Sequence, residues 1–129
     1  MIKTREQEYA ASAFRNISDE IEPKGRIYQK KYGSMAHKLP ILIRTAGLSQ
    51  ALQFVESRGS EEQKVLLKHL ADTIGYSSKL ELLSKSRSEG LGGYMHLTEK
   101  TLGALLWYKR FAQSVLKVEA GDANDTTSE

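Results

Sequence analysis

Apolar residues recur every three to four positions along most of the chain, which is the spacing of amphipathic helices. Segments that alternate apolar and polar residues, as half-buried strands do, are nearly absent. A first helix is predicted from about Lys3 to Ile21, ending where Pro23 and Gly25 follow closely. Five residues are predicted to line its apolar face: Tyr9, Ala10, Ala13, Phe14 and Ile17. Residues Arg26 to Gly33 are interpreted as a basic connector.

A second helix is predicted from about Ser34 to Ala46, with Pro40 inside it as a kink or a restart. Gly47 is typical of a C-terminal cap, and a short third helix is predicted from Leu48 to Ser57. The residues predicted to face inward on these two helices are Met35, Leu39, Leu42, Ala46, Leu48, Ala51, Leu52 and Val55.

The second half of the chain predicts three more helices. Ser60 and Gln63 form a capping box, so a fourth helix is expected from there to Ile74, with Gly75 stopping it. A fifth is expected from near Ser78 to Gly90. Gly90, Gly92 and Gly93 are interpreted as a flexible bend, and the longest helix is expected from Thr98 to about Val118. From Gly121 onward no large apolar side chain remains, which predicts disorder.

These elements predict an all-α fold, a single-domain bundle of about six helices over residues 1–118 with an acidic tail over residues 119–129. The 129 residues, 40% of them apolar, suit one modest core. The absence of cysteine excludes disulfides and thiolate metal sites and fits a reducing compartment. No apolar stretch approaches the roughly 18 residues that span a bilayer, and no signal peptide is apparent at the start. A soluble cytoplasmic protein without membrane contact is therefore expected.

Charge is distributed unevenly along the chain. From Pro23 to Val55 there is no acidic residue. The last eleven residues contain four acids and no base, so residues 1–118 carry a net charge of +7 against +3 for the whole chain. The bases of the acid-free stretch are Lys24, Arg26, Lys30, Lys31, Lys38 and Arg44. Such a run indicates an electropositive surface that phosphates can approach, although a solvated helix face is the ordinary alternative.

Catalytic and metal-binding patterns were sought and not found. His69 and Asp72 share a helix face, but two ligands without a third are a weak metal signal, so a surface pair is expected. His37 is assigned to the basic face and His96 to the connector before the last helix. The glycines near residue 90 lack the Lys-Ser/Thr pair of a phosphate-binding loop. No enzyme, metal or cofactor is therefore predicted.

The aromatic segment at the end of the chain has two interpretations. Trp107 and Phe111 could stack on bases, but their helical spacing favours packing in the core. Lys109 and Arg110 then point elsewhere and are candidates for binding phosphates or an acidic partner. Tyr28 and Tyr32, in the basic connector, could contact RNA, and packing against the first helix is at least as good an interpretation.

The second helix combines an apolar face with a basic one. Lys31 and Lys38 lie seven residues apart, and Lys30, His37 and Arg44 follow the same spacing, so each set falls at one angular position. A helix that is buried on one side and basic on the other can follow a phosphate backbone without reading base identity. The predicted nucleic-acid-binding residues are Lys30, Lys31, Lys38, Arg44, Lys109 and Arg110.

Two segments resemble the small all-helical subunit of type III-B (Cmr) CRISPR effector complexes. One is YGSMAHKLPILIRTAGLSQALQFVESRG from Tyr32 to Gly59, and the other is TEKTLGALLWYKRFAQSVLK from Thr98 to Lys117. The shared motifs are Met35 to Pro40, Ala46 to Leu52 and Trp107 to Phe111, and the resemblance covers most of residues 5–118. It does not extend to the tail.

The resemblance implies a non-catalytic subunit that stacks with further copies of itself in a minor filament. Its implied partners are the backbone and large subunits of the Cmr complex and the paired guide RNA and target RNA, in antiviral defence. Two interpretations from other classes remain. One is a sequence-specific DNA-binding regulator with Leu48 to Ser57 as recognition helix, which holds few groups suited to reading a groove. The other is a helical adaptor without nucleic-acid contact.

Overall fold

The computed structural model describes residues 3–122, which form six α-helices, one π-helical segment and no strand. The prediction of an all-α fold is confirmed. In chain order the elements are α1 (Arg5–Asn16), the π-helical η1 (Ile17–Ile21), α2 (Arg26–Ala46), α3 (Leu48–Arg58), α4 (Glu61–Thr73), α5 (Lys79–Ser88) and α6 (Leu91–Ser114). Across these residues no helix is long and apolar enough to cross a membrane.

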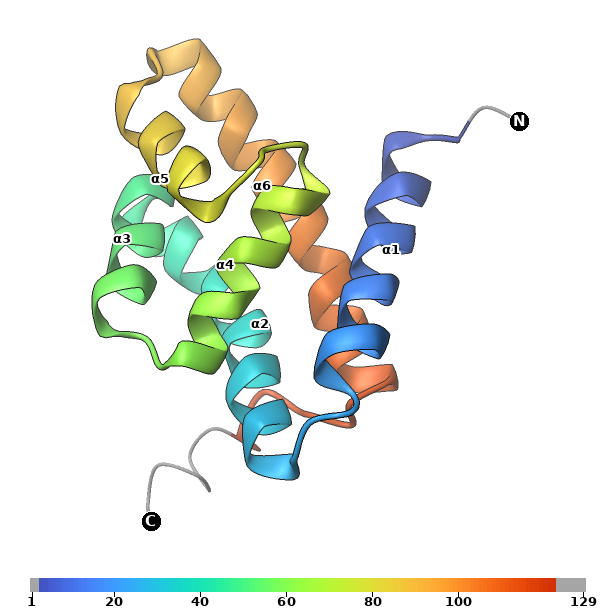
Figure 1. The fold of residues 1–129 in the computed structure, drawn as a ribbon. Coiled ribbons are helices and arrows are strands. Elements are labelled where there is room, and N and C mark those ends of the chain that lie inside the picture. Colours follow the sequence, from blue (N-terminus) through green and yellow to red (C-terminus); the bar gives the residue numbers. More distant parts are fainter. Residues whose placement is uncertain (1–2, 123–129) are drawn as a thin grey trace.

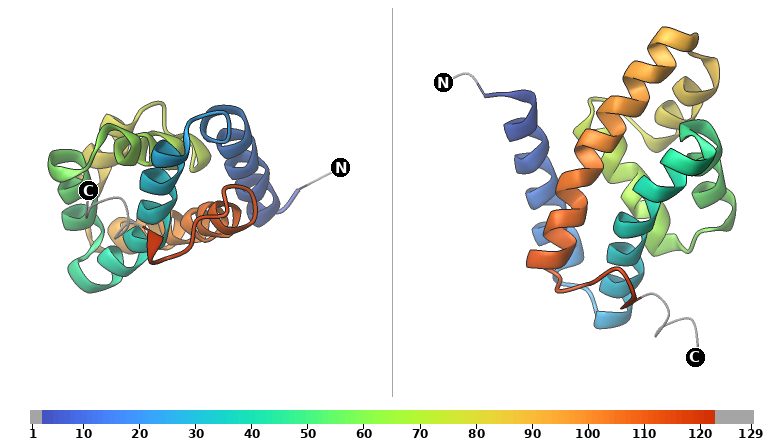
Figure 2. Two further views of the ribbon diagram at one scale, coloured as in Figure 1. Left: turned by 90° about the horizontal axis from the view of Figure 1, so that it is seen from below. Right: turned by 180° about the vertical axis from the view of Figure 1, so that it is seen from behind.

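Four helices form a ring around the core, with α1 beside α6, α6 beside α2, α2 beside α4 and α4 beside α1 (Figure 1). Helices α3 and α5 pack together against α2 and α4 at one side of this ring (Figure 2). The ring therefore brings the first and last helices of the chain into direct contact. Its largest fully buried side chains include Ile17, Ile21, Tyr32, Leu39, Leu52, Leu66, Leu70, Leu105 and Tyr108.

Local signals at the helix ends explain most of the boundaries. Ser60 forms the predicted capping box with Gln63 at the start of α4. Gly75, with φ of +98°, follows the end of α4 as predicted. Gly47 lies between α2 and α3 with φ of +91°, a left-handed conformation that favours glycine. The first predicted helix continues to Ile21, but its last turn widens into η1, where the Glu22 amide donates to the Ile17 carbonyl at 2.8 Å.

Two predicted irregular segments are helical instead. The basic connector is wrong, because α2 begins at Arg26, directly after Gly25, and runs through Pro40 without a restart. Apolar residues at helical spacing already precede Ser34, among them the fully buried Tyr32. The bend at Gly90 to Gly93 is also wrong, since α6 begins at Leu91 and includes His96. Gly92 and Gly93 lie in the first turn of α6. Glycine destabilises a helix least there, because the first four amides of any helix lack intrahelical partners.

The fully buried side of α6 includes Tyr108, whereas the two aromatic residues predicted to pack in the core are only partly buried. Tyr108 is fully buried, whereas Leu106 is 43% exposed and both Trp107 and Phe111 are half-buried against the core. Trp107 and Phe111 therefore pack on the bundle, as favoured from the spacing, but at its edge. The predicted disorder of the tail concerns residues that, beyond Asp122, lie outside the described residues.

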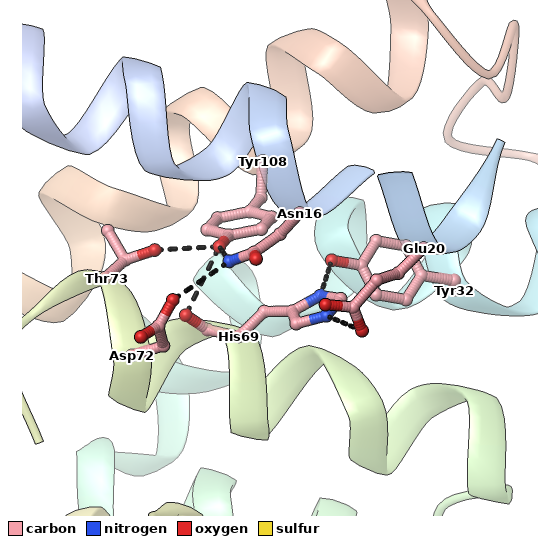
Figure 3. Close-up of polar contacts among 7 residues, drawn as sticks. All are labelled: Asn16, Glu20, Tyr32, His69, Asp72, Thr73 and Tyr108. Atoms are coloured by element: carbon pink, nitrogen blue, oxygen red, sulfur yellow. Dashed lines mark hydrogen bonds and ion pairs between the residues drawn. The ribbon is translucent and has the colours of Figure 1, made fainter. Parts of the chain in front are cut away.

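A polar cluster lies within the ring and joins its helices (Figure 3). His69 on α4 is 2% exposed, so the expected surface pair with Asp72 is wrong. The hydroxyl of Tyr32 on α2 lies 2.7 Å from His69 Nδ1, and Glu20 Oε1 on η1 lies 3.1 Å from Nε2. A neutral imidazole satisfies both partners when Nδ1 accepts from the tyrosine and Nε2–H donates to the carboxylate. Three elements are thus held by one side chain.

Tyr108 on α6 is the second centre of the polar cluster. Asn16 Nδ2 donates to its hydroxyl at 2.9 Å, and that hydroxyl lies 2.7 Å from Thr73 Oγ1 and 3.2 Å from the His69 carbonyl. Two further contacts complete the cluster: Ser12 Oγ to Thr73 Oγ1 at 2.7 Å, and Asn16 Nδ2 to Asp72 Oδ2 at 3.4 Å. Burial raises the pKa of Tyr108 to about 12, so the phenol keeps its proton.

Burial also lowers the pKa of His69, an effect that outweighs the opposing hydrogen bond and charge of Glu20. The hydrogen bond from His69 lowers the pKa of the Glu20 carboxyl, against the opposing effect of burial. Both directions describe one state, a neutral imidazole donating to an ionised carboxylate. The polar cluster is therefore built for pH values above the ordinary pKa of histidine.

Replacing Tyr108 by phenylalanine should lower the free energy of unfolding by about 1–3 kcal/mol, because Asn16 and Thr73 lose a buried partner. Urea denaturation followed by circular dichroism measures the change. Tyr76→Phe is the matched control, since Tyr76 is half-buried and its hydroxyl makes no hydrogen bond to another described residue. Equal losses in the two variants would contradict the role assigned to Tyr108.

Acidification should destabilise the fold as the pH falls through about 6.5, the ordinary pKa of histidine. In that range His69 becomes protonated in the unfolded chain but stays neutral in the folded protein. Protonation therefore favours the unfolded state, and the free energy of unfolding decreases. Urea titrations between pH 7.5 and 5.5 measure it. His69→Gln should flatten this dependence, and His96→Gln, at an exposed position, should leave it unchanged. A native chain equally stable across the range would contradict the assignment.

Candidate nucleic-acid interface

One side of α2 remains on the surface because the other side packs on α4 and α6. Lys38, Ile41 and Arg44 are exposed, and Lys30 is half-buried, about two turns before Lys38. At 3.6 residues per turn these four positions fall within about 120° of the helix circumference. They are called the α2 outer face from here on.

The charges on this face lack fixed partners. Among the residues that the structure describes, ion pairs involve Arg5, Lys64, His69 and Lys79, and none of the six predicted binding residues. Lys38 and Arg44 are thus exposed cations that no described carboxylate neutralises at close range. That state suits a surface whose partner is a polyanion outside the chain.

Lys31 lies beside the outer face and faces α4. The pKa of the Glu62 carboxyl there is lowered, first by hydrogen bonds at the start of the helix and also by the Lys31 ammonium. Sequence alone placed Lys31 in an acid-free stretch, but the fold brings a carboxylate from α4 close to it. Of the predicted set, Lys31 is therefore the base whose charge is partly offset within the protein.

The C-terminal segment after α6, residues 115–122, packs on α2 beside Gly33 and His37. His37, which was assigned to the basic face, is 5% exposed, and its Nε2 lies 2.9 Å from the Val118 carbonyl. That assignment is wrong. Val118 is itself fully buried, and a Cβ on Gly33 would lie 2.8 Å from the Val118 Cβ. The segment therefore contacts α2 at positions that lie between Lys30 and Lys38 along the helix.

Lys109 and Arg110 are exposed. They lie on α6, whereas the other four predicted binding residues lie on α2. Arg110 lies over the Trp107 ring, with its guanidinium carbon 4.7 Å from the ring centroid. It lines a small hollow between α1 and α6 together with Arg5 and Tyr9. Arg110 thus belongs to the surface between α1 and α6, which differs from the α2 outer face.

A second surface feature, on α6, was not predicted from the sequence. Leu91, Met95 and Leu106 on α6 are 77%, 62% and 43% exposed, and the half-buried Leu102 lies between them. These four residues are called the α6 stripe. Their spacing of four to seven residues, visible in the sequence, is the available signal. An apolar stripe of this length on a surface helix is typical of a protein–protein contact.

Over residues 3–122 no three histidine, aspartate or glutamate side chains gather so that they could hold a metal ion. The titratable groups of the polar cluster satisfy one another by hydrogen bonds, as a structural role requires. The features that the described surface does offer are the exposed bases of α2 and the apolar α6 stripe.

Comparisons with known proteins identify the family of this chain. The sequence profile of the family described as CRISPR-associated protein (Cas_Cmr5) matches residues 5–115. The curated protein "CRISPR system Cmr subunit Cmr5" from Thermus thermophilus is 42% identical over 116 residues, covering 90% of this chain and 99% of that one. A crystal structure of a CRISPR-associated Cmr5 family protein from the same organism superimposes with a TM-score of 0.81 at 43% identity, over 88% of this chain and 98% of the other. The chain belongs to the Cmr5 family of CRISPR-associated proteins.

Proposed function

We propose that this protein is a non-catalytic structural subunit of a type III-B CRISPR Cmr effector complex, acting in the cytoplasm in antiviral defence. In this complex the α2 outer face lies along the paired guide RNA and target RNA. The observation that carries the proposal is that Lys38 and Arg44 are exposed without a described ion pair, on a helix whose reverse side is in the core.

The geometry of α2 suits backbone contact better than base reading. Lys30 and Arg44 are separated by about 21 Å along the helix axis, at 1.5 Å per residue. Flexible lysine and arginine side chains on a rigid helix can meet successive phosphates while leaving the bases unread. Binding of this kind is independent of sequence and weakens as salt rises.

The α6 stripe supports the second part of the proposal, stacking with further copies of the protein and contact with the backbone and large subunits. Phe54 on α3 and Leu80 on α5 are also exposed, at 51% and 65%, on helices other than α6. If these apolar residues and the α6 stripe form two separate surfaces, head-to-tail association could use them, in which one surface of each copy meets a different surface of the next.

A DNA-binding regulator is less well supported by the structure. Helix α3, the candidate recognition helix, packs against α5. Glu56 Oε1 on α3 forms an ion pair with Lys79 Nζ at 2.8 Å. This charged group of α3 is therefore held by a partner within the protein. The exposed polar groups that remain are mainly those of Gln50, Gln53 and Arg58. A helical adaptor without RNA contact is distinguished by measuring RNA binding of variants in the α2 outer face.

Replacing Lys38 and Arg44 by glutamine should weaken binding to a duplex RNA and flatten the slope of log affinity against log salt. The slope should change by up to about 1.8, since each lost phosphate contact is worth about 0.9 on a B-form duplex. Fluorescence anisotropy across a salt series measures it. The matched control is Lys85→Gln with Arg87→Gln, which removes the same charges from exposed positions on α5.

If the α2 and α5 variants lose affinity equally, the α2 outer face is not the binding surface. If neither variant changes the slope, the protein is an adaptor. A strong preference for one DNA sequence would favour the regulator instead.

Introducing a charge into the α6 stripe by Met95→Glu should reduce incorporation of the protein into the effector complex several-fold, because a carboxylate would be buried against an apolar partner surface. Co-purification from cells that contain the other subunits and small RNAs measures the amount incorporated. Met95→Leu, which keeps an apolar side chain of similar volume, is the control and should assemble normally. Normal assembly of Met95→Glu would remove the α6 stripe from the proposed contacts.

A further inference from the structure

We propose that the acidic end of this chain, residues 119–129, competes with phosphate groups for the α2 outer face, and so limits RNA binding by the free subunit. The inference rests on the proposed function, because it assigns a regulation to the same face. The inference is based on the contacts that hold the chain against α2 immediately before those acids.

The anchor is a set of contacts between α2 and the backbone of the C-terminal segment. The Arg26 guanidinium donates to the carbonyls of Leu116 and Lys117, the second at 2.7 Å. His37 bonds to the Val118 carbonyl 2.9 Å away. The Val118 side chain is fully buried where Gly33 leaves room for it. Contacts over three turns of α2 thus fix the point at which the acidic residues begin.

The turn into this anchor is also specified. Lys117 adopts φ of +58°, in the left-handed region that few residues other than glycine occupy. The Val118 amide then donates to the Ala112 carbonyl at 2.9 Å, back on α6. The chain therefore leaves α6 and reaches α2 beside Gly33 and His37 in a defined way.

The length of chain after that anchor is compared with the length of the face. Glu119, Asp122, Asp125 and Glu129 follow Val118 by one to eleven residues, and each residue of extended chain spans up to about 3.3–3.6 Å. His37 is seven residues from both Lys30 and Arg44, which is about 10 Å of helix in either direction. By chain length alone, the seven residues from Val118 to Asp125 could span up to about 23–25 Å, which exceeds the distance from His37 to either end of the face.

The acids of the tail are opposite in charge to the bases of the α2 outer face, and those that the structure describes form no ion pair with a described base. Glu119 accepts a hydrogen bond from Gln113 Nε2 at 3.3 Å, and Asp122 accepts one from the Glu119 amide at 2.7 Å. Neither carboxylate is in an ion pair with a described base. A tethered group acts at an effective concentration on the order of millimolar, far above that of a dilute free carboxylate.

The test compares the full native chain with a variant whose four acids are changed to amides: Glu119→Gln, Asp122→Asn, Asp125→Asn and Glu129→Gln. The probe is a 5′-fluorescein-labelled RNA duplex, and anisotropy gives the dissociation constant. At about 50 mM salt the amide variant should bind on the order of three- to tenfold more tightly, and the gap should shrink at about 200 mM, where charges are more strongly screened.

A matched control separates local competition from the general effect of net charge. Glu6, Glu8, Glu89 and Glu99 are exposed carboxylates on the first turn of α1, at the end of α5 and on the first half of α6. These elements lie at the end of the bundle away from the C-terminal segment (Figure 1). Changing those four to glutamine alters net charge by the same amount and should raise affinity less than the tail variant does.

A double-mutant cycle then tests whether the acids act through α2. In a background of Lys38→Gln and Arg44→Gln, neutralising the tail should give a markedly smaller gain in affinity. An undiminished gain in that background overturns the proposal, as does equal binding by the native and tail-neutralised chains. In the second case the native chain still binds RNA, so the proposed function stands. If no variant binds the duplex, the RNA-contacting function and the competition both fail.

Discussion

The hydrogen bonds that join Tyr32, His69 and Tyr108 set the rotation of three helices at once. These side chains are buried away from water. A polar group that loses its hydrogen-bond partner there stays desolvated without compensation, which destabilises the folded state. Helices α2, α4 and α6 therefore have one rotational arrangement in which all of these groups are satisfied. That arrangement turns Lys38 and Arg44 outward, and the surface of the protein thus depends on the polar interior.

Much of the fold could be predicted because its information is local. Helical spacing of apolar residues and the capping box at Ser60 place α3 and α4 within a few residues of their observed ends. The first half of α2 escaped prediction because Gly33 and a cluster of bases suggest a loop. The reason for that glycine is a contact with Val118, far along the chain, which no local pattern reveals.

The candidate site shows the same division. Helical periodicity placed Lys38 and Arg44 on a common exposed face, and both are exposed on α2. It failed for His37, whose partner carbonyl is 81 residues away, and for Lys31, which the fold brings toward an acid on α4. Tyr108 was missed because spacing treats tyrosine as an apolar residue, while its partner Asn16 is 92 residues distant.

The attachment of Val118 to α2 has a practical consequence for labelling. The backbone as far as Val118 belongs to the folded body, since its carbonyls accept hydrogen bonds from Arg26 and His37. A fluorophore or affinity tag joined to the C-terminus would therefore be tethered beside the basic side of α2. The start of α1 lies at the opposite end of the bundle (Figure 1), so a label joined there would leave that side of the molecule unobstructed.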